Sequence, residues 1–530
     1  MLKMFWRKIS TSITGGAILI AFFSIIAKIV GLFRDRLLAS TFGAGQTLDV
    51  YYASFRLPDF IFNTLMLGAF AAAFIPVFIK TWSANKEEGQ RLINSLLNFF
   101  IITMLVLVGI GIALAPTIID LITPGFSSVM KTETVELTRI MLLSIVFFAA
   151  SNIFSSVLNA WRKFFLYSLA PIFYNIGIIS GIIFIVPYYG QKGLAWGVLL
   201  GAFLHMIAQL SAALYHGWRW QAALRFSTEV KKIFTLMIPR TIGLGASQIE
   251  QVVIMSIAST LSIGSIAIFN LANNLQSFPV SIFGISMAIA TFPIFSQAIA
   301  DQRMDHFRGC FGISWRKILF VMIPLSVMIL VTRAQIVRLF LGSGQFDWED
   351  TYYTAQVLGV LAVSLFAQGS IPLLARAFYS LEDTKTPLIT GVISVFINIV
   401  LGIYLSQHFG IIGLGISFSL ANIFNMLTLL FILRERIGDL DDHNLINAII
   451  KMTINSFLMG LVIYGLLHLL SSIVNMHTFL GIFLQASVAL TGGLITYLLL
   501  AYRDQLNEWK MIMEQLKKFL PKNRLKENHE

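Results

Sequence analysis

Residues 28–78 read KIVGLFRDRLLASTFGAGQTLDVYYASFRLPDFIFNTLMLGAFAAAFIPVF, and they place charged side chains among strongly apolar residues. The charged residues are Lys28, Arg34, Asp35, Arg36, Asp49, Arg56 and Asp59. The surrounding segments are apolar enough to lie in a lipid bilayer, where a charged side chain near the centre costs at least about 2.5–3.5 kcal/mol. The stretch therefore predicts buried partner groups or a water-filled cavity inside a membrane protein.

The composition of the whole chain supports this class. Of 530 residues, 57% are hydrophobic and only 12% are charged, with a mean hydropathy of +0.80. Globular proteins carry about 25% charged residues, so we expect an all-α polytopic membrane protein. Cys310 is the only cysteine, which excludes an intramolecular disulfide and a multi-cysteine metal site. The net charge of +12 is spread over short loops, unlike a nucleic-acid-binding face.

A membrane-spanning helix needs about 20 mostly apolar residues, and the sequence contains about fourteen such segments. They are 13–40, 50–79, 92–116, 135–160, 165–187, 193–216, 233–260, 264–299, 313–333, 351–376, 386–407, 410–433, 446–471 and 477–502. The first, second and eighth contain Gly, Pro or charges, so we expect bends in them. The basic N-terminus (Lys3, Arg7, Lys8) resembles a signal peptide, but the apolar run that follows is too long and lacks a small-residue cleavage site.

Lysine and arginine residues indicate the orientation. With both termini in the cytoplasm, the cytoplasmic segments carry 27 of these residues and the outer segments carry 5. Charges placed at random would not alternate over so many loops, so the positive-inside rule predicts cytoplasmic termini and an even number of spans.

An internal repeat predicts the domain organisation. FIPVF (74–78), the region of Pro171 and the region of Gly193 recur 216–220 residues later as TFPIF (291–295) and around Pro387 and Gly413. A shift of six spans preserves orientation, so we expect two parallel six-helix lobes. The predicted domains are 1–220, 221–440, a helix pair at 441–502, and a tail at 503–530 that reads as a basic amphipathic helix on the inner leaflet or a solvated helix.

Polar residues occupy corresponding spans of the two lobes, where transporters of this plan bind substrate. The first-lobe set is Lys28, Arg34, Asp35, Asp49, Arg56, Asp59 and Asn63; the second-lobe set is Gln248, Glu250, Gln251, Asn270, Asn273, Asn274 and Gln276. Cations in a cavity of low dielectric constant suit a phosphate or carboxylate ligand. The sequence therefore predicts an anion site built from first-lobe cations and second-lobe amides.

Other interpretations of these residues remain open. Arg34, Asp35 and Arg36 would also fit a paired cluster at a membrane interface, and Asp49 and Asp59 would fit helix caps or turns. Glu250 fits either a proton or cation site or a buried, hydrogen-bonded carboxylate. Five further membrane asparagines fit hydrogen bonds between helices better than ligands: Asn152, Asn175, Asn398, Asn422 and Asn425. His205 fits a packed histidine.

The sequence contains no zinc motif, phosphate-binding glycine loop or nucleophile elbow, and its predicted cytoplasmic loops are too short for a nucleotide-binding domain. We therefore expect no enzyme and no cofactor. Energy for transport would come from the membrane potential or from a monovalent cation gradient.

Several longer motifs follow one another along the chain. They are VGLFRDRLLASTFGAGQTLDVYYASFRLPDF, LNAWRKFFLYSLAPIFYN (158–175), NLQSFPVSIFGISMA (274–288), GSGQFD (342–347) and ARAFYSLEDTKTPL (375–388), the last of which contains Arg376, Asp383, Thr384 and Pro387. These motifs resemble those of the MurJ/MviN lipid II flippases, in the multidrug/oligosaccharidyl-lipid/polysaccharide exporter superfamily. The resemblance extends over essentially the whole chain and implies fourteen spans.

The resemblance also implies which substrate the protein transports and which residues bind it. Lipid-linked peptidoglycan precursor would move from the inner to the outer leaflet of the bacterial cytoplasmic membrane, with its tail in a groove formed by the last two spans. The family's cavity cations fall on Arg34 and, as a conservative change, on Lys28, and Asp35 and Asp49 match acidic positions of the family.

Two family arginines are absent, since this chain has Phe62 and Asn274 at those positions, and Ser277 stands where the family has an acidic residue. Arg56 or Arg376 would then compensate.

The resulting hypothesis is a lipid II flippase that works by alternating access in peptidoglycan and cell-wall biosynthesis. Its diphosphate-binding residues would be Lys28, Arg34, Arg56, Asn273 and Asn274, supported by Asp35, Asp49, Gln248, Glu250 and Ser277. Its partners would be membrane lipids, the lipid-linked precursor and cell-wall synthesis proteins. The alternatives are a polysaccharide-lipid flippase, a cation-coupled drug exporter, and a membrane scaffold that transports nothing.

Overall fold

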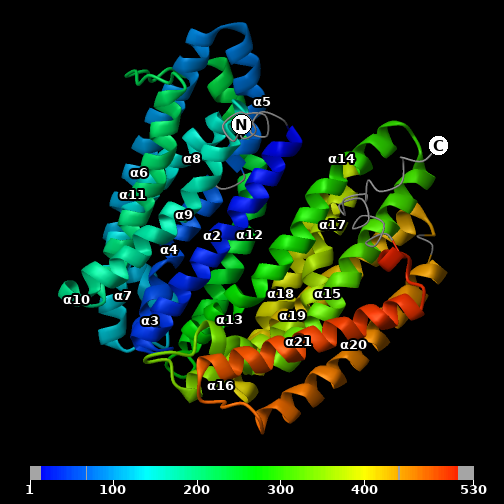
Figure 1. Ribbon diagram of the computed structural model, residues 1–530. Coiled ribbons are helices and arrows are strands. Elements are labelled where there is room, and N and C mark those ends of the chain that lie inside the picture. Colours follow the sequence, from blue (N-terminus) through cyan, green and yellow to red (C-terminus); the bar gives the residue numbers. More distant parts are fainter. Residues whose placement is uncertain (1–12, 67–68, 440–441, 511–530) are drawn as a thin grey trace, which may run out of the picture. The chain divides into compact units, whose positions relative to one another are not determined.

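A computed structural model describes residues 13–66, 69–439 and 442–510, and every regular element within these ranges is a helix (Figure 1). The chain forms two compact units. Unit 1 contains the chain up to Leu271 together with Phe340–Tyr353 and Ile399–Leu414, and unit 2 contains Ala272–Leu339, Thr354–Asn398 and the chain from Gly415. These units follow from packing, whereas the predicted lobes follow from the sequence repeat, so the lobe boundaries stay a prediction.

Unit 1 is built mainly from the helices of the first half of the chain. They are α2 (Ile13–Phe42), α3 (Gln46–Ser54), α4 (Arg56–Leu65), α5 (Ala69–Ala84), α6 (Lys86–Ile122), α7 (Ser128–Leu142), α8 (Ser144–Ala160), α9 (Phe164–Ser180), the π-helical turn η1 (Gly181–Ile185), α10 (Val186–Tyr189), α11 (Lys192–Tyr215) and α12 (Thr228–Ser259). Its apolar core includes a row of buried, stacked rings one helical turn apart, Phe70, Phe74 and Phe78.

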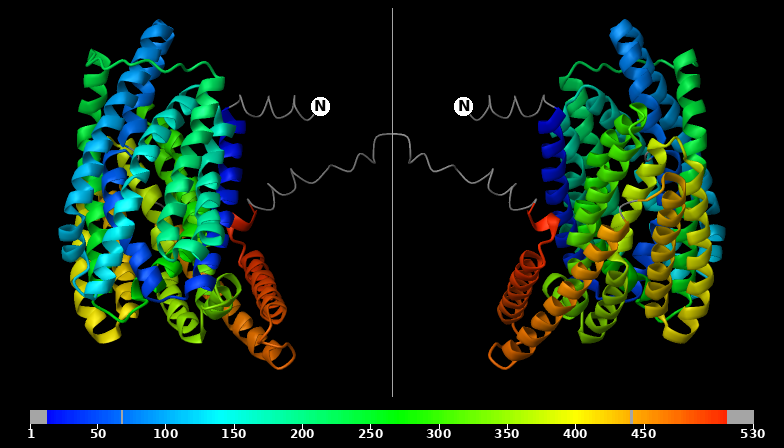
Figure 2. Two further views of the ribbon diagram at one scale, coloured as in Figure 1. Left: turned by 90° about the vertical axis from the view of Figure 1, so that its left-hand side faces the viewer. Right: turned by 90° about the vertical axis from the view of Figure 1, so that its right-hand side faces the viewer.

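Unit 2 contains most of the later helices. They are α13 (Ser265–Pro279), the π-helical turn η2 (Val280–Ile285), α14 (Ser286–Ala300), α15 (Met304–Phe340), α16 (Trp348–Val363), α17 (Leu365–Ser380), α18 (Lys385–Phe409), α19 (Ile411–Ile437), α20 (Asp442–Ser471) and α21 (Phe479–Arg503). Of these, α13, α15, α16, α18 and α19 contribute residues to both units. α20 and α21 form an antiparallel pair, drawn in orange and red in Figure 2.

The described residues contain eleven helical segments long and apolar enough to cross a membrane, or twelve if the bent pair α16–α17 is one span. The expected count of fourteen is therefore not confirmed. The two remaining predicted spans, 13–40 and 233–260, nevertheless coincide with the long helices α2 and α12.

Breaks occur in two of the three spans where bends were expected. The second span is divided into α3, α4 and α5, and the eighth is divided into α13, η2 and α14. The first span is different, because α2 continues over 30 residues without interruption. Its glycines and charges are accommodated in one continuous helix, so the bend expected there stays a prediction.

Backbone turns repeat along the chain at the spacing of the sequence repeat. Helices α7 and α8 are separated at Leu143, and α16 and α17 at Ser364. Arg162 and Glu382 follow α8 and α17 with φ values of 58° and 60°, and Gly190 and Gly410 have φ values of 56° and 57°. These pairs lie about 220 residues apart, as the sequence motifs do, so the same turns recur in both halves of the chain.

Close contact between α9 and α11 depends on glycine. A Cβ atom on Gly177 would lie 2.2 Å from the Cα of Gly201, and one on Gly181 would lie 2.4 Å from the Cα of Gly197. Small residues let membrane helices approach backbone to backbone, where van der Waals packing holds them together. This contact fixes α9, which also packs beside α2 in Figure 1 and thereby positions the first charged residues.

Candidate functional site

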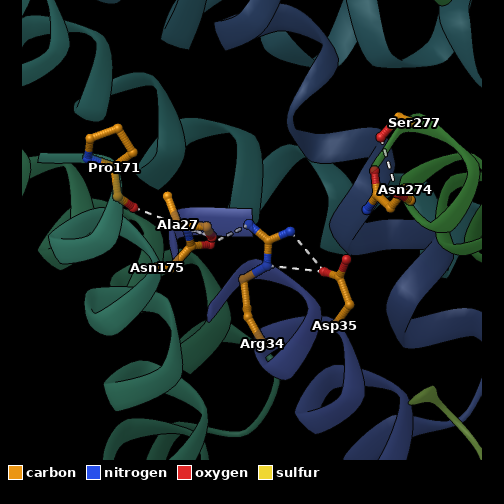
Figure 3. Close-up of polar contacts among 7 residues, drawn as sticks. All are labelled: Ala27, Arg34, Asp35, Pro171, Asn175, Asn274 and Ser277. Atoms are coloured by element: carbon orange, nitrogen blue, oxygen red, sulfur yellow. Dashed lines mark hydrogen bonds and ion pairs between the residues drawn. The ribbon is translucent and has the colours of Figure 1, made fainter. Parts of the chain in front are cut away.

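The first polar group of unit 1 is centred on Arg34 (Figure 3). Its Nε and Nη2 donate to Oδ1 of Asp35 at 3.0 and 2.7 Å, and its Nη1 donates to Oδ1 of Asn175 on α9 at 3.0 Å. The amide of Asn175 in turn donates to the backbone oxygens of Pro171 and Ala27 at 3.0 and 3.5 Å. The guanidinium is therefore held in a fixed position between α2 and α9.

Lys28 differs from Arg34 in exposure and contacts. It lies on α2, its side chain is exposed, and it has neither a hydrogen bond nor an ion pair with any described residue. It is nevertheless near enough to interact electrostatically with Asp35 and Arg34. Asp35 itself is only 3% exposed. The buried carboxylate of Asp35 therefore pairs with Arg34 and lies near Lys28 without forming an ion pair with it.

A second polar group joins α4 to α12 and α13 within unit 1. Arg56 donates from Nη1 to Oε1 of Gln251 at 2.8 Å and from Nη2 to Oδ1 of Asn270 at 3.2 Å. Asn63, two turns further along the chain, donates to Oε1 of Gln248 at 3.3 Å. Amides predicted for the second lobe therefore contact residues predicted for the first.

Asp49 caps a helix that begins far away in the sequence. Its carboxylate is 2% exposed and accepts from the backbone N–H of Gly264 at 2.6 Å and of Ala267 at 2.8 Å, in the first turn of α13. A carboxylate in this place satisfies orphan donors and interacts favourably with the helix dipole. A Cβ atom on Gly264 would lie 1.9 Å from the backbone oxygen of Ala44, so only glycine fits there.

The same junction contains a second set of bridging hydrogen bonds. Asp350, in the first turn of α16, accepts from the N–H of Ala44 at 2.8 Å, and Gln345 N–H donates to the oxygen of Ser40 at 2.9 Å. The loop after α2 is thus tied to both the α12–α13 turn and the α15–α16 turn. Asp350 was not among the residues singled out from sequence, where its only signal was an acidic first turn.

The residues of α13 from Ala272 onward belong to unit 2. Gln276 donates to Oδ1 of Asn273 at 3.0 Å and exchanges two 3.0 Å hydrogen bonds with Gln368 on α17, and Ser277 donates to the backbone oxygen of Asn274 at 3.0 Å (Figure 3). Gln368 was likewise missed from sequence, because nothing in its apolar surroundings marks it. The polar face of α13 is therefore built from hydrogen-bonded amides.

With this geometry in place, known proteins identify the family. The model for "Lipid II flippase MurJ" matches residues 38–519. The chain belongs to the MurJ family.

Individual relatives are similar to this chain over most of their length. A probable lipid II flippase MurJ of Buchnera aphidicola subsp. Acyrthosiphon pisum is 27% identical over 491 residues, covering 90% of this chain and 95% of the relative. A lipid II flippase MurJ of Burkholderia cenocepacia is 26% identical over 430 residues, covering 78% and 82%.

A solved MurJ structure in an inward closed conformation superposes with a TM-score of 0.77 at 27% identity, covering 92% of this chain and 100% of that one. An inward-facing multidrug transporter of the MATE family superposes at 0.65 with 16% identity, covering 80% and 99%, which shows the shared fold alone.

The positions where this chain departs from the expected MurJ arginines have other contacts. Phe62 packs against Phe148 with ring centroids 5.4 Å apart, and Phe148 also contacts Tyr174 and His205. His205 is held by Ser151, whose Oγ lies 2.6 Å from Nδ1, as expected of a packed histidine. Phe62 thus lies in an aromatic cluster, and Asn274 lies among the amides of α13.

The motif around Asp383 has a structural role. Asp383 accepts from the N–H groups of Lys385 and Thr386 at 3.0 Å and from the Thr386 hydroxyl at 2.7 Å, and it pairs with Arg436 at the end of α19. Although burial raises the pKa of this carboxyl, the bonds from Thr386 and Arg436 lower it to about 2. Thr384 is exposed beside it, and Pro387 lies in the first turn of α18.

The remaining candidates are less informative. Glu250 is partly buried on α12, and Arg376 is partly buried on α17. Asp59 lies in the first turn of α4, close enough to influence Arg56 electrostatically. The predicted amphipathic tail falls mostly on residues 511–530, and the basic N-terminus on 1–12; both lie outside the described residues.

Proposed function

We propose that this protein translocates lipid II from the inner to the outer leaflet of the bacterial cytoplasmic membrane by alternating access. The observation that carries the proposal is the family match over residues 38–519. Cations within lipid-embedded helices support it, because charges at such positions usually serve substrate pathways. The protein would act in peptidoglycan synthesis and would catalyse no covalent reaction.

The head group would bind through its diphosphate. Lys28 offers an exposed ammonium, and Arg34 offers a guanidinium held in place by Asp35 and Asn175. Arginine binds phosphate as a fork and lysine as a point charge, so together they suit a diphosphate in a cavity. Arg56 and the amides of Asn273 and Asn274 would complete the set, while the lipid tail would stay in the membrane against α20 and α21.

No cofactor would be required. Moving one elementary charge through 100 mV is worth about 2.3 kcal/mol, so the membrane potential is sufficient to reset a cavity that carries net positive charge. A monovalent cation is the alternative source of energy, with Glu250 as its candidate site. Both termini would face the cytoplasm, and partners beyond lipids would be proteins of cell-wall synthesis.

The test is depletion of the protein in its host, followed by measurement of lipid II accessible at the outer leaflet. We expect accessible lipid II to fall and to recover with the wild-type protein. The double variant Lys28→Ala/Arg34→Ala should fail to restore it, whereas Lys231→Ala/Lys232→Ala, which removes two exposed cations at the start of α12, should restore it fully.

Other outcomes would identify the alternatives. Unchanged outer-leaflet lipid II after depletion would refute the proposal. Rescue by the Lys28/Arg34 double variant would favour a scaffold. Native mass spectrometry of the purified protein would distinguish bound lipid II from another lipid-linked saccharide or a drug-like molecule.

A further inference from the structure

Arg56 contrasts with Arg34 in the chemistry of its acceptors. Arg34 donates to a carboxylate, whereas Arg56 donates to two neutral amide oxygens, those of Gln251 and Asn270, at 2.8 and 3.2 Å. Its Nε is covered by surrounding atoms and has no hydrogen-bond acceptor among the described residues. The Arg56 guanidinium is therefore held in position with one donor unused.

The charge of Arg56 is only partly balanced. Asp59, in the same helix, interacts with it electrostatically, but no carboxylate oxygen among the described residues lies within ion-pair distance. Amide oxygens orient a guanidinium without neutralising it. Hydrogen bonds between two charged groups are roughly twice as strong as neutral ones, and phosphate accepts from arginine in a two-pronged geometry. An anion that reached Arg56 would thus compete effectively with Gln251 and Asn270.

Displacing these amides would also weaken a helix contact. Gln251 lies on α12 and Asn270 on α13, and Asn63 of α4 also donates to Gln248 of α12 at 3.3 Å. Helices α4 and α12 pack side by side as well. Hydrogen bonds between membrane helices contribute about 0.6 kcal/mol on average. Loss of the two bonds from Arg56 would therefore weaken the polar part of this contact, while the packing of α4 against α12 remains.

We propose that Arg56 is an anion-binding residue for which the diphosphate of the head group competes with Gln251 and Asn270. Binding of the substrate at Arg56 then breaks the hydrogen bonds from α4 to Gln251 on α12 and Asn270 on α13 and favours the change of conformation. This inference rests on the proposed function and adds to it a link between binding and movement. It assigns Gln251 and Asn270 to the control of that step.

Inorganic pyrophosphate is the probe, added to the purified full-length protein in detergent or nanodiscs. Hydrogen exchange followed by mass spectrometry reports on residues 245–270. In the wild type we expect pyrophosphate to accelerate exchange in this segment. Arg56→Ala and Gln251→Glu should abolish the acceleration, the first by removing the cation and the second by giving it a permanent carboxylate partner. Asn270→Asp provides a second carboxylate variant if Gln251→Glu does not fold.

One variant should bind pyrophosphate more tightly than the wild type does. Gln251→Leu removes one competing acceptor, so it should bind pyrophosphate about 3–10-fold more tightly, corresponding to about 0.6–1.4 kcal/mol at 1.4 kcal/mol per tenfold change. Gln297→Leu is the control: it removes an amide on α14 that donates to Asp301 at 2.9 Å and leaves the acceptors of Arg56 intact, so its affinity should equal that of the wild type.

Three results would overturn the inference. They are an absence of any pyrophosphate effect in the wild type, an undiminished effect in Arg56→Ala, and unchanged or weaker binding in Gln251→Leu. These outcomes are separate from the test of the proposed function, because they concern an anion and a helix contact in the purified protein. Failure of lipid II transport in cells would refute the function while leaving the pyrophosphate measurements unaffected.

Discussion

Asp49 allowed two interpretations from sequence, a helix cap or a site residue, and the structure selects a cap on a distant helix. Its carboxylate oxygens accept from the N–H groups of Gly264 and Ala267, which are more than 200 residues away in the chain. Hydropathy locates the charged residue but not its partner, because nothing local marks the start of α13 as its neighbour. Asn175 was correctly interpreted as joining helices, but its bond to Arg34 followed from no local pattern.

Replacing Asp49 with alanine should loosen the start of α13. Two buried N–H groups would lose their acceptor, at a cost of about 1–3 kcal/mol each. We expect faster hydrogen exchange at Gly264 and Ala267, with the middle of α6 unchanged. Asp49→Asn retains one carbonyl acceptor and should give an intermediate rate. Exchange in Asp49→Ala equal to that of the wild type would show that this cap contributes nothing.

Asp383 should make a pH-dependent contribution to stability. Its pKa is about 2 when folded, below the ordinary value of 3.8, so the folded state favours the ionised form. The contribution is complete above about pH 4 and disappears as the pH falls through 2. Because Arg436 is half-exposed, we expect at most about 1 kcal/mol.

Asp383→Asn tests this dependence, since asparagine still caps α18 but cannot pair with Arg436 as an ion. Its unfolding temperature should lie below that of the wild type from pH 8 to pH 5, and the difference should shrink below pH 4. A difference that grows on acidification would contradict the assignment.

At the scale of elements, the segment after α21 is attached to the rest of unit 2 by buried contacts. Glu508 is 4% exposed, and its carboxylate lies 3.1 Å from Nε of Arg316 on α15, as an ion pair whose N–H does not point at the oxygen. Tyr497 of α21 donates to the backbone oxygen of Phe320 at 2.9 Å, and Asn455 of α20 donates to Asp504 at 3.0 Å. These contacts fix the α20–α21 pair against α15.

Glu508→Gln should destabilise this attachment strongly. Removing one partner of a buried ion pair typically costs about 3–5 kcal/mol. We expect a lower unfolding temperature in detergent for Glu508→Gln. The double variant Arg316→Met/Glu508→Leu, which removes both charges, should recover much of the loss. Equal stability of the wild type and Glu508→Gln would exclude an energetic role for the pair.

At the scale of the whole chain, sequence patterns predicted more of the architecture than of the site. Long apolar segments anticipated the helices, because hydropathy is a local property. The turns at Gly190 and Gly410 recur at the spacing of the repeat, but the sequence analysis did not single them out. The contacts of Arg56 were not predictable, since Gln251 lies 195 residues away and its amide resembles any other polar residue. The division of the second span into three helices was expected only as a bend.

The orientation of the chain can be tested with single cysteines. In a Cys310→Ser background, Ala84→Cys lies exposed at the end of α5 and Ser128→Cys lies exposed at the start of α7. The distribution of lysine and arginine places the first in the cytoplasm and the second outside. A membrane-impermeant maleimide should label Ser128→Cys in intact cells and Ala84→Cys only after permeabilisation. The reverse pattern would invert the topology.

The ion pair between Arg316 and Glu508 has a consequence for how the protein is made. Arg316 enters the bilayer with α15, but Glu508 is synthesised only after α16 to α21. During translation Arg316 is therefore present before Glu508, its partner in the folded protein, has been synthesised. Unit 2 becomes complete only when the last helix pair has left the translocon. A ribosome that stalls before residue 508 would leave a unit 2 that lacks this buried ion pair.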